Sequence, residues 1–308
     1  MDVPLILVSN DDGIESNGLW AAAEAVVPLG EVMVVAPDRQ WSGGARSMPR
    51  GVTGRIREET RRLLGVEVLG YAVDASPALA VDHGVIELAP RRPALVVSGI
   101  NFGANLGIEV TISGTVGAAL EAAAFGIPAL AVSEEMGAEH HLDGDSRADF
   151  EASKAFIRYF AEMALSERMP QDVDVLNLNV PASATAGTPW RLTRLSRDRY
   201  FLPVPPDRAN GEGRPGYRLI ENLTGAEPGT DIHAVMVDRL VSVTPLSLDL
   251  TSRVAMDGKD RPMPKQRLGG GQVARFSHLF LLPDSGWQGN GRSRDPARVA
   301  VSANDGRE

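Results

Sequence analysis

The sequence VPLILVSNDDG, residues 3–13, decides the fold class, because an apolar strand ends there at two adjacent carboxylates. Residues 3–8 are rich in Leu, Ile and Val, which is typical of a buried strand in a parallel sheet. In open α/β sheets, ligands bind at the carboxyl ends of such strands. The loop that contains Asp11 and Asp12 is therefore predicted to lie at a ligand site.

This loop has two interpretations that the segment alone does not separate. Neighbouring carboxylates in a crevice repel each other and lose solvation, and a hard divalent cation would compensate their charge. Asn10, Asp11, Asp12 and Gly13 also suit a polar turn in which a side chain bonds to the nearby backbone. Both a cation site and a simple turn remain open at this point.

The chain continues with alternating strand and helix patterns, as expected for a doubly wound α/β fold with a mostly parallel sheet. The helices are indicated by apolar positions at a period near 3.6, by Ser and Pro at one start, and by Gly and Pro at one end. The expected strands are residues 31–36, 66–73, 94–97, 130–132 and 175–180, and the expected helices are 18–27, a segment that opens at 76–77, 115–125 and one that includes 156–164.

The second part of the chain has a different composition. From about residue 181 to 229, short strand candidates at 191–195 and 217–220 are separated by Pro, Gly and charged residues. This pattern predicts a protruding β-hairpin arm at about 185–229, which would pair with another chain because an isolated ribbon is only marginally stable. A strand at 240–244 would return to the body, so we expect one α/β domain over residues 1–251.

Beyond that domain, residues 252–308 are rich in Gly, Arg and Asp and offer few core candidates. We predict a largely disordered tail. Over the whole chain, 43% of the 308 residues are hydrophobic, which suffices for a sizeable core. No apolar run is long enough for a membrane span and no signal segment begins the chain, so we expect a soluble, cytoplasmic protein without a membrane partner.

Charge and cysteine content narrow the chemistry. The formal net charge of -9 disfavours polymeric nucleic acid as a partner. The absence of cysteine excludes disulfides, thiolate metal sites and a cysteine nucleophile, so a metal would be bound by oxygen or imidazole ligands.

Three further loops follow predicted strands or open a helix, and each carries polar groups. Residues 37–44 and 98–107 place hydroxyl or amide oxygens beside glycines, which let the backbone approach a ligand. Residues 113–115, Ser-Gly-Thr, open a predicted helix, whose N–H groups and dipole favour an anion. A carboxylate pair for a cation beside such donors is the combination that a phosphoester site needs.

Several of these segments form short motifs in a fixed order along the chain. They are LVSNDDGI at 7–14, VAPDR at 35–39 followed by Ser42 and Gly43, VSGIN at 97–101 and SGTVGAA at 113–119, with later segments at 177–181, 229–231 and 243–246. In sequence and order they resemble the SurE family, named after the stationary-phase survival protein E. The resemblance covers roughly residues 3–251.

The resemblance implies a 5′- and 3′-nucleotidase, a phosphomonoesterase that acts on nucleoside monophosphates with one divalent cation per subunit, most often Mg²⁺ or Mn²⁺. It also implies a Rossmann-like body and a homodimer or homotetramer in which the hairpin is swapped. Carried over to this sequence, the resemblance gives the metal ligands Asp11, Asp12, Ser42 and Asn101, and a phosphate pocket of Asn10, Gly43, Asn105, Ser113, Gly114 and Thr115.

Two segments depart from the family pattern. Residues 75–81 are ASPALAV where the family commonly has GTPADCV, and residues 43–46 are GGAR where a Gly-Ala-Ser run is usual. Neither change removes a proposed ligand.

The catalytic hypothesis is that the cation polarises the phosphoryl group while Asp11 or Asp12 orients or deprotonates the attacking water. The alternatives are a metal-dependent nucleotide-sugar transferase and a nonenzymatic nucleotide-sensing module.

Overall fold

The structure of the chain, a computed structural model, describes residues 3–136 and 149–253, apart from 168, 207, 209–211, 214, 221, 222 and 224. Two units separate along the chain, Met1–Asp249 and Leu250–Glu308. Every element below belongs to the first unit. Of the predicted tail, only residues 252 and 253 are described, so this prediction lies outside the described residues.

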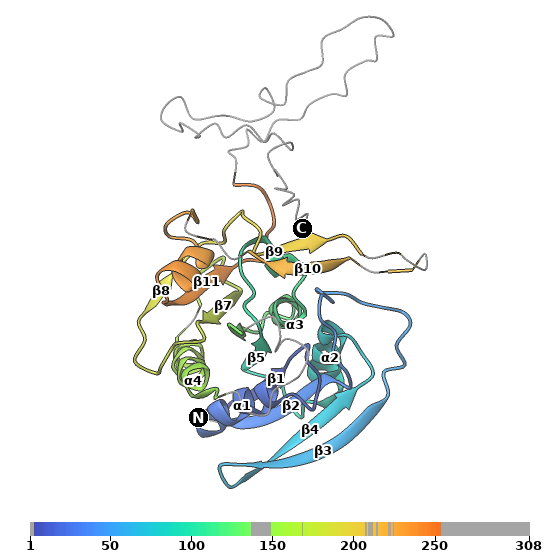
Figure 1. Cartoon of the computed structure of the whole chain (residues 1–308). Coiled ribbons are helices and arrows are strands. Elements are labelled where there is room, and N and C mark those ends of the chain that lie inside the picture. Colours follow the sequence, from blue (N-terminus) through green and yellow to red (C-terminus); the bar gives the residue numbers. More distant parts are fainter. Residues whose placement is uncertain are drawn as a thin grey trace, which may run out of the picture. The chain divides into compact units, whose positions relative to one another are not determined.

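The body is built on one twisted sheet with the strand order β3-β4-β2-β1-β5-β6-β7-β11-β8 (Figure 1). The pairs from β4 through β2, β1, β5 and β6 to β7 are parallel, whereas β3 and β11 run antiparallel to β4 and β7. The predicted mostly parallel α/β sheet is therefore confirmed. The bounds are β1 (Leu5–Ser9), β2 (Glu31–Pro37), β3 (Ile56–Leu63), β4 (Val66–Val73), β5 (Leu95–Phe102), β6 (Ala129–Glu134), β7 (Val175–Val180), β8 (Trp190–Leu192) and β11 (Val241–Leu246).

Helices cover both faces of the sheet and enclose two apolar cores (Figure 1). The first core, with Ile6 and Val8, lies under α1 (Asn17–Val26) and α4 (Glu151–Ser166). The second, with Leu5 and Leu7, lies under α2 (Pro77–His83) and α3 (Gly114–Ala124). Because successive strand residues point to opposite faces, a strand buried on both sides must be apolar throughout, as β1 is.

The predicted helix starts are confirmed in detail at α2. The hydroxyl oxygen of Ser76 accepts a hydrogen bond from the Leu79 N–H, and Pro77 occupies the first turn. Short helical turns complete the body. They are η1 (Val27–Leu29), η2 (Gly84–Leu88), η3 (Gly107–Thr111) and η5 (His233–Val237). None of the helices in the described part of the chain is both long enough and apolar enough to cross a bilayer.

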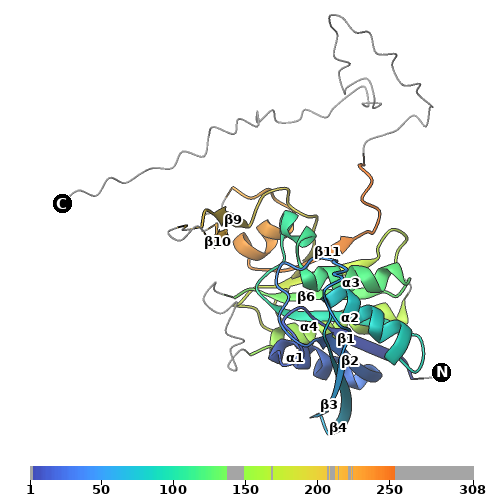
Figure 2. The same cartoon turned by 90° about the vertical axis from the view of Figure 1, so that its right-hand side faces the viewer.

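The strands that form the arm differ from those predicted. The strand candidate at 191–195 does not pair with 217–220, because β8 joins the main sheet beside β11. The arm is instead β9 (Phe201–Val204) paired antiparallel with β10 (Gly216–Leu219), a separate two-stranded sheet that projects from the body (Figure 2). Strand pairing across some 50 residues depends on long-range contacts, which local patterns do not specify.

Besides β9, strand β3 has no counterpart among the predicted elements. Its sequence IREETRRL contains five charged residues, so it lacks the apolar run that predicts a buried strand. It lies at the edge of the sheet, antiparallel to β4, where Arg57, Glu58 and Arg62 are exposed and their charges discourage pairing with another chain.

Candidate active site

The loop after β1 is a turn and also presents the two carboxylates. The side chain of Asn10 accepts a hydrogen bond from the Gly13 N–H at 3.2 Å and donates one to the Gly13 carbonyl at 3.1 Å. Gly13 has φ +93°, a conformation that favours glycine. Asn10 is fully buried and closes the turn, so the predicted turn chemistry belongs to this residue. Asp11 and Asp12 are held by other groups.

Asp11 is bound by the N-terminal turn of α3. Thr115 Oγ1 donates to Asp11 Oδ1 at 2.6 Å, and both residues are buried. The helix comes this close because residue 114 is glycine: a Cβ there would lie 2.7 Å from both Cβ and Oδ2 of Asp11. Ser113 caps the helix by accepting a hydrogen bond from the Val116 N–H. The Thr115 hydroxyl therefore points at Asp11. Ser113 is the residue of the Ser-Gly-Thr motif that lines the pocket.

Asp12 is oriented by two donors from neighbouring loops. Gln40 Nε2 donates to Oδ1 at 3.2 Å, and the Phe102 N–H donates to Oδ2 at 3.4 Å. Asp12 follows β1, Gln40 follows β2 and Phe102 ends β5, so these hydrogen bonds connect the ends of three adjacent strands.

The electrostatics of this pair favour a cation. Burial raises the pKa of Asp11, against the lowering effect of hydrogen bonds from Thr115 and the backbone of residues 114 and 115. Burial, and then the charge of Asp11, raise the pKa of Asp12. Positive charge between the carboxylates would reverse both effects.

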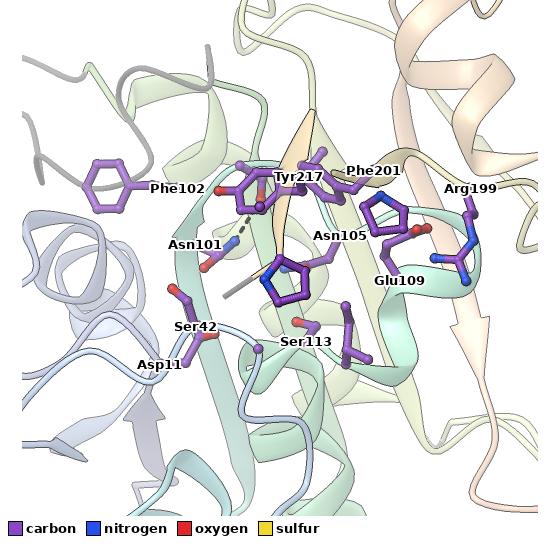
Figure 3. Close-up of a pocket in the computed structure, with 17 residues that line it drawn as sticks. Asp11, Ser42, Asn101, Phe102, Asn105, Glu109, Ser113, Arg199, Phe201 and Tyr217 are labelled. Atoms are coloured by element: carbon purple, nitrogen blue, oxygen red, sulfur yellow. Dashed lines mark hydrogen bonds between the residues drawn. The ribbon is translucent and has the colours of Figure 1, made fainter. Parts of the chain in front are cut away.

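The remaining predicted ligands come from the next strand ends. The β5–β6 register shifts between Ser98 and Asn101, and an irregularity of this kind re-aims side chains. The Asn101 side-chain nitrogen donates to the Gly103 carbonyl at 2.7 Å, which leaves its oxygen turned away from that bond, on the side of the pocket where Asp11 and Ser42 lie (Figure 3). Ser42 lies in the loop after β2.

These groups line one pocket of about 500 Å³. Its polar end is formed by predicted site residues, namely Asp11, Ser42, Gly43, Asn101, Asn105 and Ser113. Asp12, the residue after Asp11, does not itself line the pocket, and neither do Asn10, Gly114 and Thr115. Among the described residues, no three His, Cys, Asp or Glu side chains gather as a metal centre. A cation at this end would therefore also need the neutral oxygens of Ser42 and Asn101, which suits a hard cation such as Mg²⁺.

Asn105 is fixed by two asparagines that the sequence analysis did not assign to the site. Asn179 Oδ1 accepts from the Asn105 N–H at 2.7 Å, and the side chains of Asn177 and Asn179 donate to its carbonyl at 3.0 and 3.1 Å. Asn105 Nδ2 donates to Ser133 Oγ at 2.8 Å. The sequence of β7, VLNLNV, indicates their role, because two asparagines in a buried strand need hydrogen-bond partners.

The far end of the pocket is formed by residues that the sequence did not link to the carboxylates. They are Glu109 of η3, Arg199 before β9, and Phe201 and Tyr217 of the arm (Figure 3), and Ile112 and Pro203 also line the pocket. No local motif indicated them, because the arm reaches the pocket only through the tertiary fold.

Comparison with known proteins gives consistent matches. The family described as Survival protein SurE matches residues 6–201. The 5′-nucleotidase SurE of Thermococcus gammatolerans is 42% identical over 250 residues, which are 81% of this chain and 92% of that protein. The 5′-nucleotidase SurE of Archaeoglobus fulgidus is 43% identical over 254 residues, 82% of this chain and 94% of that protein. The solved SurE protein from Aquifex aeolicus has a TM-score of 0.61 at 34% identity and covers 80% of this chain and 95% of its own.

Proposed function

This chain belongs to the SurE family and is a 5′-nucleotidase, and we propose that it hydrolyses nucleoside 5′- and 3′-monophosphates with a divalent cation bound by Asp11, Asp12, Ser42 and Asn101. One observation carries the proposal. Asp11, Ser42 and Asn101 come from the ends of three different strands and line the same pocket. Such convergence at the carboxyl ends of a parallel sheet is where ligands bind in this fold class.

The donor set supports one Mg²⁺ or Mn²⁺ per subunit. Two carboxylates, a hydroxyl and an amide oxygen are hard ligands, and they leave positions for water and a phosphate oxygen. Both carboxylate pKa values are raised by burial, so ionising the pair is costly unless a cation is present. Binding of the cation would release protons from the pair.

In the reaction water attacks phosphorus, the bond from phosphorus to the ester oxygen breaks, and that oxygen takes up a proton from solvent to leave as the nucleoside hydroxyl. A bound divalent cation supplies Lewis-acid polarisation of the phosphoryl group. Asp11 or Asp12 orients the attacking water and accepts its proton. The Ser113 hydroxyl and the Asn105 amide, at the same end of the pocket, donate to phosphate oxygens as negative charge develops on them.

Thr115 and Gly114 act indirectly in this scheme. Thr115 holds Asp11 through its 2.6 Å hydrogen bond, and Gly114 provides the space for that contact. Gly43 lines the same pocket, and its φ of +74° is a conformation that favours glycine. We also propose a homodimer or homotetramer formed through the β9–β10 arm, since an isolated ribbon gains stability by pairing.

A phosphate-release panel tests the function. Wild type, Asp11→Asn and Asp38→Asn would be assayed on the common nucleoside 5′- and 3′-monophosphates with Mg²⁺, Mn²⁺ or chelator. Asp38 is a matched control, an exposed carboxylate in the loop after β2 that pairs with Arg39 at 3.0 Å.

We expect release by wild type and Asp38→Asn with either metal, none with chelator, and a loss of at least about 100-fold in Asp11→Asn. Undiminished turnover by Asp11→Asn contradicts the proposal. Slow monophosphate hydrolysis with tight binding of nucleoside diphosphates points to a transferase, and binding without turnover points to a sensing module.

A further inference from the structure

One face of the β9–β10 arm is apolar and turned toward the pocket. Phe201 pairs with Leu219 and Pro203 with Tyr217, and because side chains alternate along a strand these four residues share a face. Phe201 and Tyr217 line the pocket opposite the end that contains Asp11 (Figure 3), and Pro203, which pairs with Tyr217, also lines it. The rings of Phe201 and Tyr217 meet edge to face, with centroids 5.1 Å apart and planes at 81°. An aromatic wall therefore faces the proposed cation site.

The base of the arm is fastened to the loop that carries Asn105. Asp231 is fully buried and accepts hydrogen bonds from the Gly107 N–H at 2.7 Å and the Ser196 N–H at 2.8 Å. Glu109, also buried, accepts from the Tyr200 N–H at 3.2 Å. These carboxylates connect the segment before β9 to the loop after β5.

A small apolar core reinforces the same connection. Leu106 of the loop after β5 is buried together with Tyr200 and Ile232, and Phe201 and Leu219 of the arm pack against this cluster. The aromatic wall and the proposed phosphate end are thus held at a fixed separation across one pocket.

We propose that this wall is the nucleoside subsite: Phe201, Pro203 and Tyr217 bind the sugar and stack on the base while the phosphate lies beside Asp11, Asn105 and Ser113. The inference rests on the proposed function and names what that site recognises. Ring faces and Pro203 contact the π-face that every base has, so purine and pyrimidine nucleotides would bind similarly. Phosphomonoesters without a base would lose this contact.

The experiment compares substrates that differ in the base. kcat/KM would be measured for AMP, UMP and ribose 5-phosphate with Mg²⁺, using wild type, Tyr217→Ala, Tyr217→Phe and Phe201→Leu. Tyr159→Ala is the control, because Tyr159 is a half-exposed aromatic residue on α4 that does not line the pocket. Inhibition by adenosine and by inorganic phosphate would be measured in parallel.

We expect Tyr217→Ala and Phe201→Leu to lower kcat/KM for both nucleotides by about tenfold or more, mainly through KM, because aromatic stacking on a base is a binding contribution of that order. Ribose 5-phosphate should change less than about twofold by the same reasoning. Inhibition by adenosine should weaken while inhibition by phosphate stays constant. Tyr159→Ala should behave like wild type, and Tyr217→Phe should restore most of the kcat/KM that Tyr217→Ala loses, because it keeps the aromatic ring.

Equal losses for all three substrates, or no loss for any, would overturn the nucleoside subsite. In both cases wild-type hydrolysis of AMP would leave the proposed function standing. If wild type itself releases no phosphate from any substrate, the proposed function fails first, so the two failures are distinguishable. Phe201→Leu retains an apolar side chain against the small core, and near-native thermal stability of all three arm variants would show that the arm is intact.

Discussion

Gly114→Ala tests whether the close approach of α3 to Asp11 positions the carboxylate for catalysis. The added Cβ would lie 2.7 Å from Cβ and Oδ2 of Asp11 and 3.0 Å from its Cγ. Carbon atoms in favourable contact are about 3.5–4.0 Å apart, so Asp11 or the helix must move by roughly 1 Å. Gly114 has no positive φ, and the strain comes from this contact alone.

The size of the effect follows from that displacement. A misplacement of about 1 Å in a catalytic group costs on the order of 100-fold in rate, so kcat/KM should fall by about that factor. Stability should change much less, because overpacking costs about 1–3 kcal/mol while Ala favours a helix over Gly by up to about 1 kcal/mol. A large loss of activity with a folded protein is therefore the expected signature.

The assay is phosphate release from AMP with saturating Mn²⁺, together with the midpoint of urea unfolding. Gly51→Ala is the matched control, since a Cβ at Gly51 meets no atom within 4 Å and its φ is not positive. Wild-type activity in Gly114→Ala would refute the reasoning, because it would mean that Asp11 can shift by this distance without consequence.

Three further outcomes are expected. Thr115→Val removes the 2.6 Å hydrogen bond to Asp11. Because hydrogen bonds to charged groups contribute about 1.5–3 kcal/mol, kcat/KM should fall by about tenfold or more, whereas Thr115→Ser should stay near wild type. Equal rates in wild type and both variants would contradict this role. Burial raises the pKa of Glu134 to about 7, so the folded protein loses stability as pH rises from about 4 to 7. Glu134→Gln should abolish this loss and be more stable than wild type by up to about 3 kcal/mol at pH 8, as measured by urea unfolding. Identical pH profiles of stability in the two proteins would argue against it. The raised pKa values of Asp11 and Asp12 mean that protons compete with a cation, so excess Mg²⁺ should raise the melting temperature more at pH 8 than at pH 5, and a larger shift at pH 5 would be the wrong sign.

The central sheet was predictable because burial on both faces leaves a strong local signal. β1 is buried at every position, and its apolar run ends where the carboxylates begin. The order of strands is not local information, yet the rule that ligands bind at carboxyl ends was enough to bring the loops after β1, β2 and β5 together. Asp11, Ser42 and Asn101 line one pocket, and their role as metal ligands stays a prediction.

The parts that escaped prediction depend on contacts between distant segments. Thr115 was expected to face an anion, but its hydroxyl donates to Asp11, 104 residues earlier in the chain. β8 was assigned to the arm, although it pairs with β11 of the main sheet. Tyr217 was predicted only as part of a strand, because its neighbours in the sequence do not indicate which pocket the arm faces.

The central claim is that four oxygen-bearing side chains bind one divalent cation, and equilibrium binding of Mn²⁺ tests it most directly. Calorimetric titration of the whole chain would compare wild type with Asp11→Asn, Ser42→Ala, Asn101→Ala and Asp38→Asn. We predict one site per chain, weakened by at least about tenfold in the first three variants and unchanged in Asp38→Asn. Binding by Asp11→Asn and Asn101→Ala with the stoichiometry and affinity of wild type would contradict the account.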